Sequence, residues 1–447
     1  MKKTILAFTT IVFTIFFACN TGKKTTGTKT VIAATDTALF RLVEEKTFQY
    51  FWDGAEPNSG LARERFHADD IYPTHNKNIV TSGGGGFGLM AILVGIERGF
   101  ITRQQGLERF ERIVQFLETA DRFHGAWPHW WQGETGKVYP FSRYDDGGDL
   151  VESSFMAQGL LCVRQYFQKG TEKEKALAAR IDKLWKEIEF DWYRNGKNVL
   201  YWHWSPNNEW KMNFAVHGYN ECLIMYVLGA SSPEHGISKE VYTEGWARHG
   251  EIAGDTSYMG LRTILDHYEH NDDPVGPLFW AHYSYLGLDP RNLSDQYGNY
   301  WDLNVNHAMI HYKYCVENPQ GYEGYGPDCW GLTSSYSMNG YAGHRPTEDF
   351  GVISPTAALS SMPYTPDQSM AFARFLYSPE RDSLIGKYGP YDAFSFEHKW
   401  MLPRYLAIDQ GPIPVMIENY RTGLIWKLFM SAPEVQNGLK KLGFSYE

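Results

Sequence analysis

The acidic stretch DDGGDLVESSFMAQGLL, residues 145–161, places four carboxylates within eight positions and then becomes apolar. Asp149 and Glu152 open the apolar run with the spacing of a capping box, in which the first residue caps a helix and the second reaches back to it. Residues at i and i+3 also lie on one helix face. The stretch therefore predicts a helix start at which capping and carboxylate chemistry coexist.

Two further acids and a pair of glycines precede this helix start. Asp145 and Asp146 add negative charge that capping does not require, and Gly147 and Gly148 let the backbone approach another group closely. Glycoside hydrolysis needs carboxyl groups in pairs: one protonates the leaving oxygen, and the other activates water or attacks the sugar carbon. A helix N-terminus favours an ionised carboxylate, which suits the second role.

Another candidate acid opens a second apolar run. Glu221 lies in HGYNECLIMYVLG, residues 217–229, directly after Asn220. A general acid needs a raised pKa, from burial or from nearby negative charge, and an apolar helix start supplies the first. The alternative is structural: Glu221 is then an ordinary first-turn acid behind an Asn220 cap. Asp409, in the sequence DQGP, is a further acid before an expected helix.

Aromatic residues make up 16% of the chain, with 15 Trp, 29 Tyr and 26 Phe. WPHWWQ (127–132), YWHWSP (201–206) and the Tyr- and Gly-rich stretch 321–337 mix rings with polar groups in loop-like settings. Rings stack on the apolar faces of sugars, although core packing is an equally good explanation for any single Trp. The candidate substrate-binding residues are Trp127, His129, Trp130, Trp131, Trp202, His203, Trp204, His217, Tyr219 and Tyr391.

Charge and motifs exclude several classes of protein. The net charge of −10 argues against nucleic acid and against an anionic membrane surface as partners. It also argues against a polysaccharide lyase with a basic cleft. A phosphorylase would need a Gly-rich loop with clustered Lys or Arg, which the sequence lacks. The 15 His form no H-E-x-x-H spacing, so we expect no metal and no cofactor; HYEHNDD (267–273) fits a solvated loop better than a calcium site.

Four cysteines lie in the body of the chain. Cys162, Cys222 and Cys315 fall in apolar helical runs, and none of them forms a C-x-x-C pair with another cysteine or with Cys329. We expect buried core thiols, with neither a disulfide framework nor a zinc site.

The N-terminal residues predict a targeting sequence rather than a folded element. A basic start is followed by a 14-residue apolar stretch, shorter than the roughly 20 residues of a spanning helix. FFAC resembles a bacterial lipoprotein signal, so residues 1–19 are expected to be the signal with Cys19 as the lipidated residue. Residues 20–35 are expected to be a flexible tether. This predicts a lipid-anchored monomer facing the periplasm or the exterior; an ordinary secretory signal is the alternative.

The rest of the chain predicts helical hairpins. Residues 36–52 have a helical pattern. Residues 87–100 and 150–167 are almost entirely apolar, as buried helices are. Each is followed by an amphipathic helix, 103–120 and 173–190. The stripes of these two helices are Leu107, Phe110, Ile113, Val114 and Leu117, then Leu177, Ile181, Leu184, Trp185 and Ile188.

Six buried helices are expected, starting near Ser82, Asp149, Asn220, Tyr300, Pro355 and Gly411. Six similar units without linkers indicate one all-α domain, residues 36–447. Its expected architecture is an (α/α)6 barrel, a toroid of six helical hairpins with aromatic-rich loops such as 193–213 over the active-site face. An open solenoid is the alternative, although no fixed-period repeat supports it. In such a toroid the inner helices point their N-termini to one mouth, which gathers the carboxylates.

Several long stretches of the chain resemble a known family. The stretches that carry the resemblance are GGDLVESSFMAQGLL, HGYNECLIMYVLGASSP, GDTSYMGLR, DCWGLTSSYS, GVISPTAALSSMPYTP and DQGPIPVMIENYRTGLIW. They are similar to the glucoamylase-like lipoproteins of Bacteroidetes, a family that includes the bacterial β-1,2-glucanases. The resemblance implies an (α/α)6 barrel and inverting hydrolysis of a β-1,2-linked glucan, and it does not imply starch as substrate.

The resemblance also implies which acids take part. The family's candidate catalytic acids fall on Asp149, Glu152 and Glu221, with Asp409 as another acid at the site. We expect Glu221 to act as general acid and Asp149 or Glu152 to position or activate water, with Asp409 supporting charge or serving as the base instead. Inversion predicts a carboxylate separation of roughly 6.5–9.5 Å. The alternative function is a non-catalytic glycan-binding lipoprotein, which would need the aromatics and not the acids.

Overall fold

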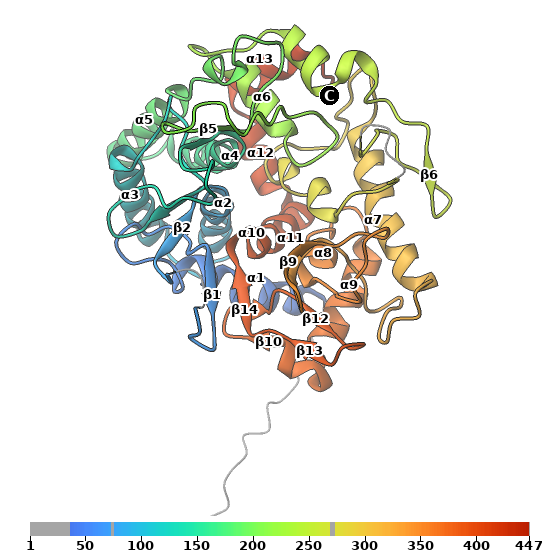
Figure 1. Ribbon diagram of the computed structural model, residues 1–447. Helices are drawn as coiled ribbons and strands as arrows, with labels where there is room; N and C mark the ends of the chain where they lie inside the picture. Colours follow the sequence, from blue (N-terminus) through green and yellow to red (C-terminus); the bar gives the residue numbers. More distant parts are fainter. Residues whose placement is uncertain (1–35, 73–75, 269–272, 447) are drawn as a thin grey trace, which may run out of the picture. The chain divides into compact units, whose positions relative to one another are not determined.

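The computed structural model describes residues 36–72, 76–268 and 273–446 (Figure 1). The expected signal sequence, Cys19 and the tether lie outside these residues. Within them, no helix combines the length and the apolar character needed to cross a membrane.

The first half of the domain alternates buried and amphipathic helices, as predicted. Helices α2 and α4 are buried almost all round, whereas α3 and α5 bury one stripe each. Every residue of the two predicted stripes is buried. Thr102 and Thr171 begin α3 and α5 with complete capping boxes, which satisfy backbone N–H groups of the first turn. The helices are α1 (Asp36–Trp52), α2 (Ser82–Glu97), α3 (Arg103–Thr119), α4 (Leu150–Phe167) and α5 (Glu172–Lys186).

The second half has shorter helices. Proline stands at the first positions of α8, α9, α11 and α13, where its missing N–H costs no hydrogen bond. The helices are α6 (Leu223–Ser231), α7 (Tyr300–Glu317), α8 (Pro355–Leu359), α9 (Pro366–Leu376), α10 (Ala407–Gln410), α11 (Pro412–Thr422), α12 (Leu424–Met430) and α13 (Pro433–Leu442). Helices therefore begin within three residues of all six predicted starts.

One of the six starts belongs to a different kind of helix. Helix α7 begins at Tyr300 but buries only one face, and Val316 on its other side is 42% exposed. The interior position is taken by two short 3-10 turns, η4 (Leu278–Ala281) and η5 (Ser284–Leu286). The expectation of a buried helix near Tyr300 is thus corrected. The apolar residues of η4 and η5 form runs too short for a helical period to be recognised.

The interior turns are held by hydrogen bonds from three inner helices. Gln158 of α4 donates to the carbonyl of Tyr283 over 3.1 Å, and Asn419 of α11 donates to that of Leu286 over 2.9 Å. The backbone N–H of Ile224 in α6 donates to the Ser284 hydroxyl over 3.0 Å. These bonds satisfy buried peptide groups that no regular helix would pair.

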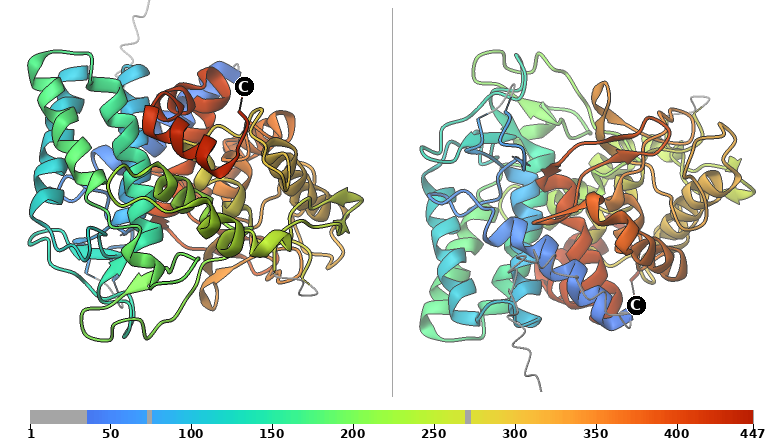
Figure 2. Two further views of the ribbon diagram at one scale, coloured as in Figure 1. Left: turned by 90° about the horizontal axis from the view of Figure 1, so that it is seen from above. Right: turned by 90° about the horizontal axis from the view of Figure 1, so that it is seen from below.

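The two ends of the domain meet. Helix α1 packs against α2 and α11, and Arg421 of α11 forms an ion pair with the buried Glu44 of α1. Figure 2 shows the C-terminal helices (red) beside α1 (blue). This contact closes the helices into a barrel, so the open solenoid is excluded and the (α/α)6 prediction is confirmed.

Strands are short and belong to the loops. In the described residues they form two-stranded antiparallel ladders and no larger sheet. Three ladders matter for the site: β1 (Arg65–His67) with β14 (Arg404–Leu406), β2 (Ile79–Thr81) with β3 (Trp130–Gln132), and β4 (Gly148–Asp149) with β5 (His203–Trp204). The others are β6 (Ser257–Tyr258) with β7 (Leu261–Arg262), β8 (Ser334–Ser337) with β9 (Gly340–Gly343), β10 (Ile385–Gly386) with β11 (Gly389–Pro390), and β12 (Phe394–Ser395) with β13 (Trp400–Met401).

The cysteines are core residues. Cys162, Cys222, Cys315 and Cys329 are all buried free thiols, as predicted for the first three. Burial raises the pKa of the Cys222 and Cys315 thiols well above the ordinary value, which leaves both thiols protonated.

Glycines let α2 and α4 cross at close range, and this contact yields a stability prediction. A Cβ on Gly86 would lie 2.6 Å from Cα of Met156. Gly86→Ala should lower the free energy of unfolding by about 1–3 kcal/mol, because the helices must move apart. Urea denaturation measures this, and Gly326→Ala, where a Cβ meets nothing within 4 Å, is the control. Equal stability of the two variants would show that the crossing can relax.

Candidate active site

A cavity of about 670 Å³ lies where inner helices begin. Thr81 before α2, Glu152 of α4, Glu221 before α6 and Ile408 of α10 all line it. The prediction that one mouth collects the inner-helix N-termini is therefore confirmed. The walls are largely aromatic, as a site for the apolar faces of sugars requires.

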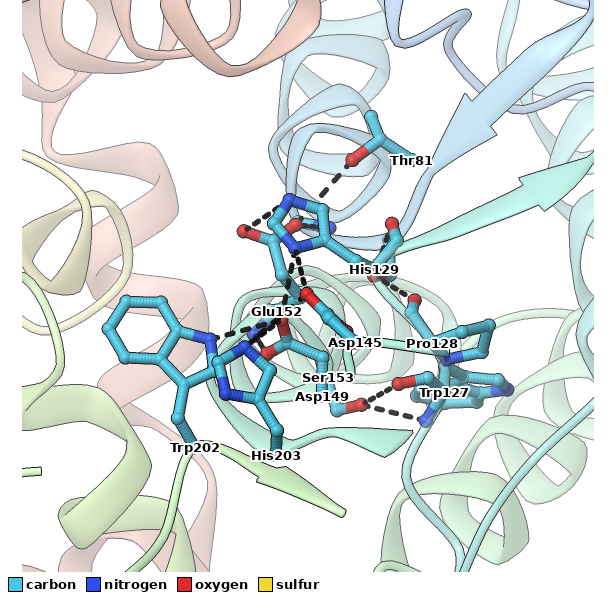
Figure 3. A network of polar contacts seen from close by, with 12 residues as sticks. Thr81, Trp127, Pro128, His129, Asp145, Asp149, Glu152, Ser153, Trp202 and His203 are labelled. Atoms are coloured by element: carbon cyan, nitrogen blue, oxygen red, sulfur yellow. Dashed lines mark hydrogen bonds and ion pairs between the residues drawn. The ribbon is translucent and has the colours of Figure 1, made fainter. Parts of the chain in front are cut away.

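Asp149 is both the cap of α4 and the centre of a polar cluster. Its Oδ1 accepts the backbone N–H of Glu152 at 2.9 Å, which is the predicted capping bond. Its Oδ2 accepts the indole N–H of Trp202 at 3.0 Å and lies 3.1 Å from Nδ1 of His129. The side chain is fully buried, so these partners replace water around the carboxylate. Figure 3 shows the arrangement.

Asp145 joins the same cluster from the loop before β4. Its Oδ2 lies 3.5 Å from Nδ1 of His129 and 3.4 Å from Nε2 of His203. Burial alone would raise the pKa of Asp145, but the two histidines outweigh it and hold that pKa well below its usual range. Burial has the opposite effect on His129 and would lower its pKa. The neighbouring Glu152, Asp145 and Asp149 outweigh burial and raise the pKa of His129 well above its usual value. The cluster therefore contains an imidazolium among carboxylates.

Glu152 has a different environment from Asp149, although both belong to the first turn of α4. Its Oε2 accepts the backbone N–H of Gly83 at 2.7 Å, and Thr81 Oγ1 lies 3.5 Å away. A Cβ at position 83 would clash with the Glu152 carboxylate, which explains a glycine there. Burial, reinforced by the Asp149 charge, raises the pKa of Glu152 to about 7. Glu152 does not reach back to the cap as a capping box would require, so that part of the structural alternative is wrong.

Glu221 lines the cavity immediately before α6. Burial raises its pKa to about 7, and the negative charges of Glu152 and Asp149 add to the rise. The Asn220 side chain accepts the N–H of Cys222 at 3.0 Å, so Asn220 closes the turn that leads into the helix. Glu221 therefore lies in a turn before α6 and not in its first turn behind an Asn220 cap, and near pH 7 part of the population carries the proton that a general acid needs.

Asp409 is buried beside a second acid that the sequence analysis missed. Tyr283 donates its hydroxyl to Oδ1 of Asp409 over 3.3 Å, and the N–H of Tyr336 donates to Oδ2 of Asp392 over 2.7 Å. Burial and the neighbouring Asp392 raise the pKa of Asp409 well above its usual value, and burial raises that of Asp392 to about 6. Two buried carboxyls in contact share a proton, because both cannot be ionised together.

A second cavity of about 610 Å³ adjoins the first. Trp202 lines both cavities, so the two meet at this residue. His217, Tyr219, His267 and Trp280 line the second cavity. The two cavities together form an aromatic-lined space on both sides of Trp202.

The predicted binding residues divide into two groups. Those lining a cavity are His129, Trp130, Trp202, His217 and Tyr219. Those lining neither cavity are Trp127, Trp131, His203, Trp204 and Tyr391.

The side chains of the second group pack away from the two cavities. Trp127 and Trp131 are fully buried, and their indoles donate to the carbonyls of Leu117 and Asp121. Trp204 packs on His124, with ring centroids 4.9 Å apart, and Tyr391 packs on Tyr405 at 5.2 Å. Alternating Trp and His in a short loop does not reveal which side faces inward.

Several cavity residues were missed because no motif marks them. Arg65 and Arg404 come from the paired strands β1 and β14, which are more than three hundred residues apart in sequence. Tyr336 and Tyr341 come from β8 and β9, within and just beyond the stretch 321–337 that was noted for its tyrosines. Pairing between distant strands gives no local signal. The Tyr-rich composition of 321–337 was the one usable indication for Tyr336.

The ligand atoms of His129, Asp145 and Asp149 lie within 4.8 Å of one another, as they would around a metal ion. The ring of His129, however, faces carboxylates through both nitrogens: Nδ1 lies 3.1 Å from Asp149, and Nε2 lies 3.9 Å from Glu152 Oε1. An imidazole with a proton on each nitrogen has no lone pair for a metal. We therefore assign the cluster as a set of ion pairs.

The barrel and its cavity define the class of protein: a helical barrel whose buried carboxyls suit acid–base work on a glycosidic bond. The family described as "Putative glucoamylase" matches residues 213–433. An endo-β-1,2-glucanase from Chitinophaga pinensis, solved with sophorotriose and glucose, is 64% identical, with a TM-score of 0.91 over 93% of this chain and 99% of that one. The chain belongs to this glucoamylase-like family.

Two relatives from Parabacteroides distasonis are longer proteins. An exo β-1,2-glucooligosaccharide sophorohydrolase acting at the non-reducing end is 47% identical over 92% of this chain. The chain spans 59% of the length of that relative. A solved β-1,2-glucanase is 45% identical, with a TM-score of 0.85 over 92% of this chain and 60% of the other.

Proposed function

We propose that this protein is a glycoside hydrolase that cleaves β-1,2-linked glucan or its oligosaccharides by an inverting mechanism with two carboxyl groups. The observation that carries the proposal is the pair Glu152 and Glu221, both with a pKa of about 7 and both lining one aromatic cavity. The β-1,2 linkage rests on what the relatives are described as cleaving. A non-catalytic glycan-binding protein would not need carboxyls held at this proton affinity.

In the proposed mechanism Glu221 gives its proton to the glycosidic oxygen as the bond to the anomeric carbon breaks. A water molecule attacks that carbon from the opposite face and passes a proton to a carboxylate. Asp149 is our candidate for that carboxylate, because it contacts Trp202 and His129, which both line the cavity. Asp409 is the alternative, and its proton shared with Asp392 would then have to leave first.

The pH dependence of kcat/KM follows from the acid. Activity should fall as pH rises through about 7, because Glu221 loses the proton it must donate. The Glu152 charge helps to raise the pKa of Glu221. Glu152→Gln should therefore move this falling limb to lower pH. Initial rates between about pH 4 and pH 9 measure both effects. A limb that stays in place in the variant would show that the two groups are not coupled.

The experiment that tests the proposal is product analysis on linear β-1,2-glucan, with maltooligosaccharides as control. Hydrolysis of the first and not the second is expected. We favour endo action, because aromatic space lies on both sides of Trp202 and the endo-acting relative shares 64% of its sequence. A ladder of products supports endo action, and sophorose alone would indicate exo action. No product from β-1,2-glucan would contradict the proposal.

The cellular setting is a further proposal that rests on the sequence. We propose that Cys19 is lipidated and that the domain is tethered, as a monomer, to the cell envelope facing the periplasm or the exterior. The apolar stretch that ends at FFAC supports this. A soluble polymer such as glucan would be accessible to an enzyme in that position.

A further inference from the structure

We propose that His129 is a positioning residue of this hydrolysis: its ring bridges Asp149 and Glu152 and holds the two carboxyl groups in place. The role goes beyond the sugar contact that the sequence predicts for this histidine. The expected effect of His129 on the reaction rate rests on the proposed function, whereas the expected protonation of its ring does not.

The backbone of His129 is fixed to one inner helix. Ser82, the first residue of α2, donates its backbone N–H to the His129 carbonyl over 3.1 Å and its hydroxyl to the Pro128 carbonyl over 2.6 Å. The next residue, Trp130, pairs with Thr81 in the β2–β3 ladder. The histidine is therefore held at the start of α2 before its side chain makes any contact.

The side chain reaches the first turn of the neighbouring inner helix. Nδ1 lies 3.1 Å from Oδ2 of Asp149, and Nε2 lies 3.9 Å from Oε1 of Glu152 (Figure 3). The ring thus stands between the two carboxyls of α4. A protonated ring presents an N–H and a positive charge to both carboxyls, whereas a neutral ring would leave one nitrogen without a proton opposite a carboxylate.

An aromatic ring covers the imidazole. Phe141 stacks on it, with ring centroids 4.1 Å apart and planes 12° from parallel. Phe141 is itself 49% exposed, so it lies between the imidazole and solvent. The face of a phenyl ring attracts a cation and excludes water, which strengthens the charge pairs beneath it. An exposed phenylalanine at a sugar site is thus explained by the ion pair it shields.

The charged groups around the ring favour this state. Those in contact with it are Asp145, Asp149 and Glu152, all of them acids. Those that line the same cavity are Glu64, Arg65, Glu221 and Arg404. His203 stands on the far side of Asp145, 3.4 Å from it. The negative charge next to the ring exceeds the positive charge, in agreement with the raised pKa of His129.

The bridge places positive charge between two acids in one helix turn. The positive ring opposes the rise in the pKa of Glu152. Without it, two adjacent buried carboxylates would repel each other and one would take up a proton. Water activation by this pair of acids would then require a higher pH.

The test combines two variants with a direct reading of the ring. His129→Asn keeps a donor near Nδ1, and His129→Gln keeps one near Nε2, but neither carries a charge. Both should fold, lower kcat about tenfold or more, and move the rising, acid limb of the pH profile up by about one unit, because a carboxylate that loses a cation is harder to ionise. In the native protein, ¹⁵N NMR of labelled histidines should show a ring that stays doubly protonated above the pH range in which histidine ordinarily titrates, and this signal should vanish in His129→Asn.

The control is His124→Asn. His124 also faces an acid, Glu189 at 3.1 Å, but lies outside both cavities, and its left-handed backbone suits asparagine. Its pH profile should match the native one. A His129 ring that is neutral at pH 7, or an acid limb unchanged in both His129 variants, would overturn the proposal. A requirement for a divalent cation after EDTA treatment would also overturn it. The NMR result stands even if β-1,2-glucan is not the substrate.

Discussion

Glu221→Gln is expected to lower kcat on β-1,2-glucan by about 10²–10⁴-fold, the usual contribution of a general acid. Glutamine has nearly the same shape but no transferable proton. Glu221 has a pKa of about 7 because it is buried near two other acids, and it lines the cavity directly. Reducing-end assays on the purified variant measure the loss.

Two controls separate a lost acid from a damaged fold. The thermal unfolding of Glu221→Gln should match that of Glu118→Gln, whose side chain pairs with Arg180 on the outer surface and should leave activity unchanged. An aryl β-sophoroside with a good leaving group needs little protonation, so Glu221→Gln should lose much less activity on it. Equal losses on both substrates would contradict a proton-donating role.

Asp149→Asn is expected to lower kcat by about 10²-fold or more while the fold is kept. Asparagine can still cap α4 by accepting the Glu152 N–H, and caps nearly as well as aspartate. Its amide nitrogen then faces the indole N–H of Trp202 in place of Oδ2, so that hydrogen bond is lost. Asparagine also removes the carboxylate that faces His129 and that would take a proton from water.

The comparison with Asp149→Ala separates the cap from the carboxylate, because both variants remove the carboxylate and only alanine removes the cap. Losing the cap costs about 0.5–2 kcal/mol. Stability should therefore fall further in Asp149→Ala than in Asp149→Asn, whereas both should lose activity. Near-native activity of Asp149→Asn, with a large loss in Asp409→Asn, would place water activation on Asp409 instead.

The sequence predicts the starts of the inner helices well because those starts have local causes. Asp149 caps α4, the glycines after Ser82 allow close packing of α2, and Pro412 opens α11. Each of these residues affects a helix start only a few positions away, so a short stretch of sequence is enough to predict that start. The acids gathered at the mouth follow from the same starts once the helices close into a ring.

The rest of the site depends on contacts between distant segments. Asp392, from the loop between β11 and β12, contacts Asp409 of α10, and Arg404 lies opposite His67 in the pair of β1 with β14. Nor does the pattern reveal direction: Trp130 faces the cavity, whereas Trp131, the next residue, is core. In a strand, neighbours point to opposite faces, and which face is the cavity is decided by the partner strand. His129 was predicted as a sugar contact because tryptophans surround it in sequence. Its pairing with the acids could not be predicted, because they belong to a different segment of the chain.

The most direct test of the mechanism is the anomeric form of the first product. Proton NMR of a rapid digestion of linear β-1,2-glucan detects the new reducing ends before they mutarotate. Attack by water from the face opposite the leaving group turns a β linkage into an α product. The mechanism proposed for Glu221 and its partner carboxylate predicts that the α anomer appears first. Initial release of the β anomer would contradict it and would mean that a carboxylate, rather than water, attacks the sugar.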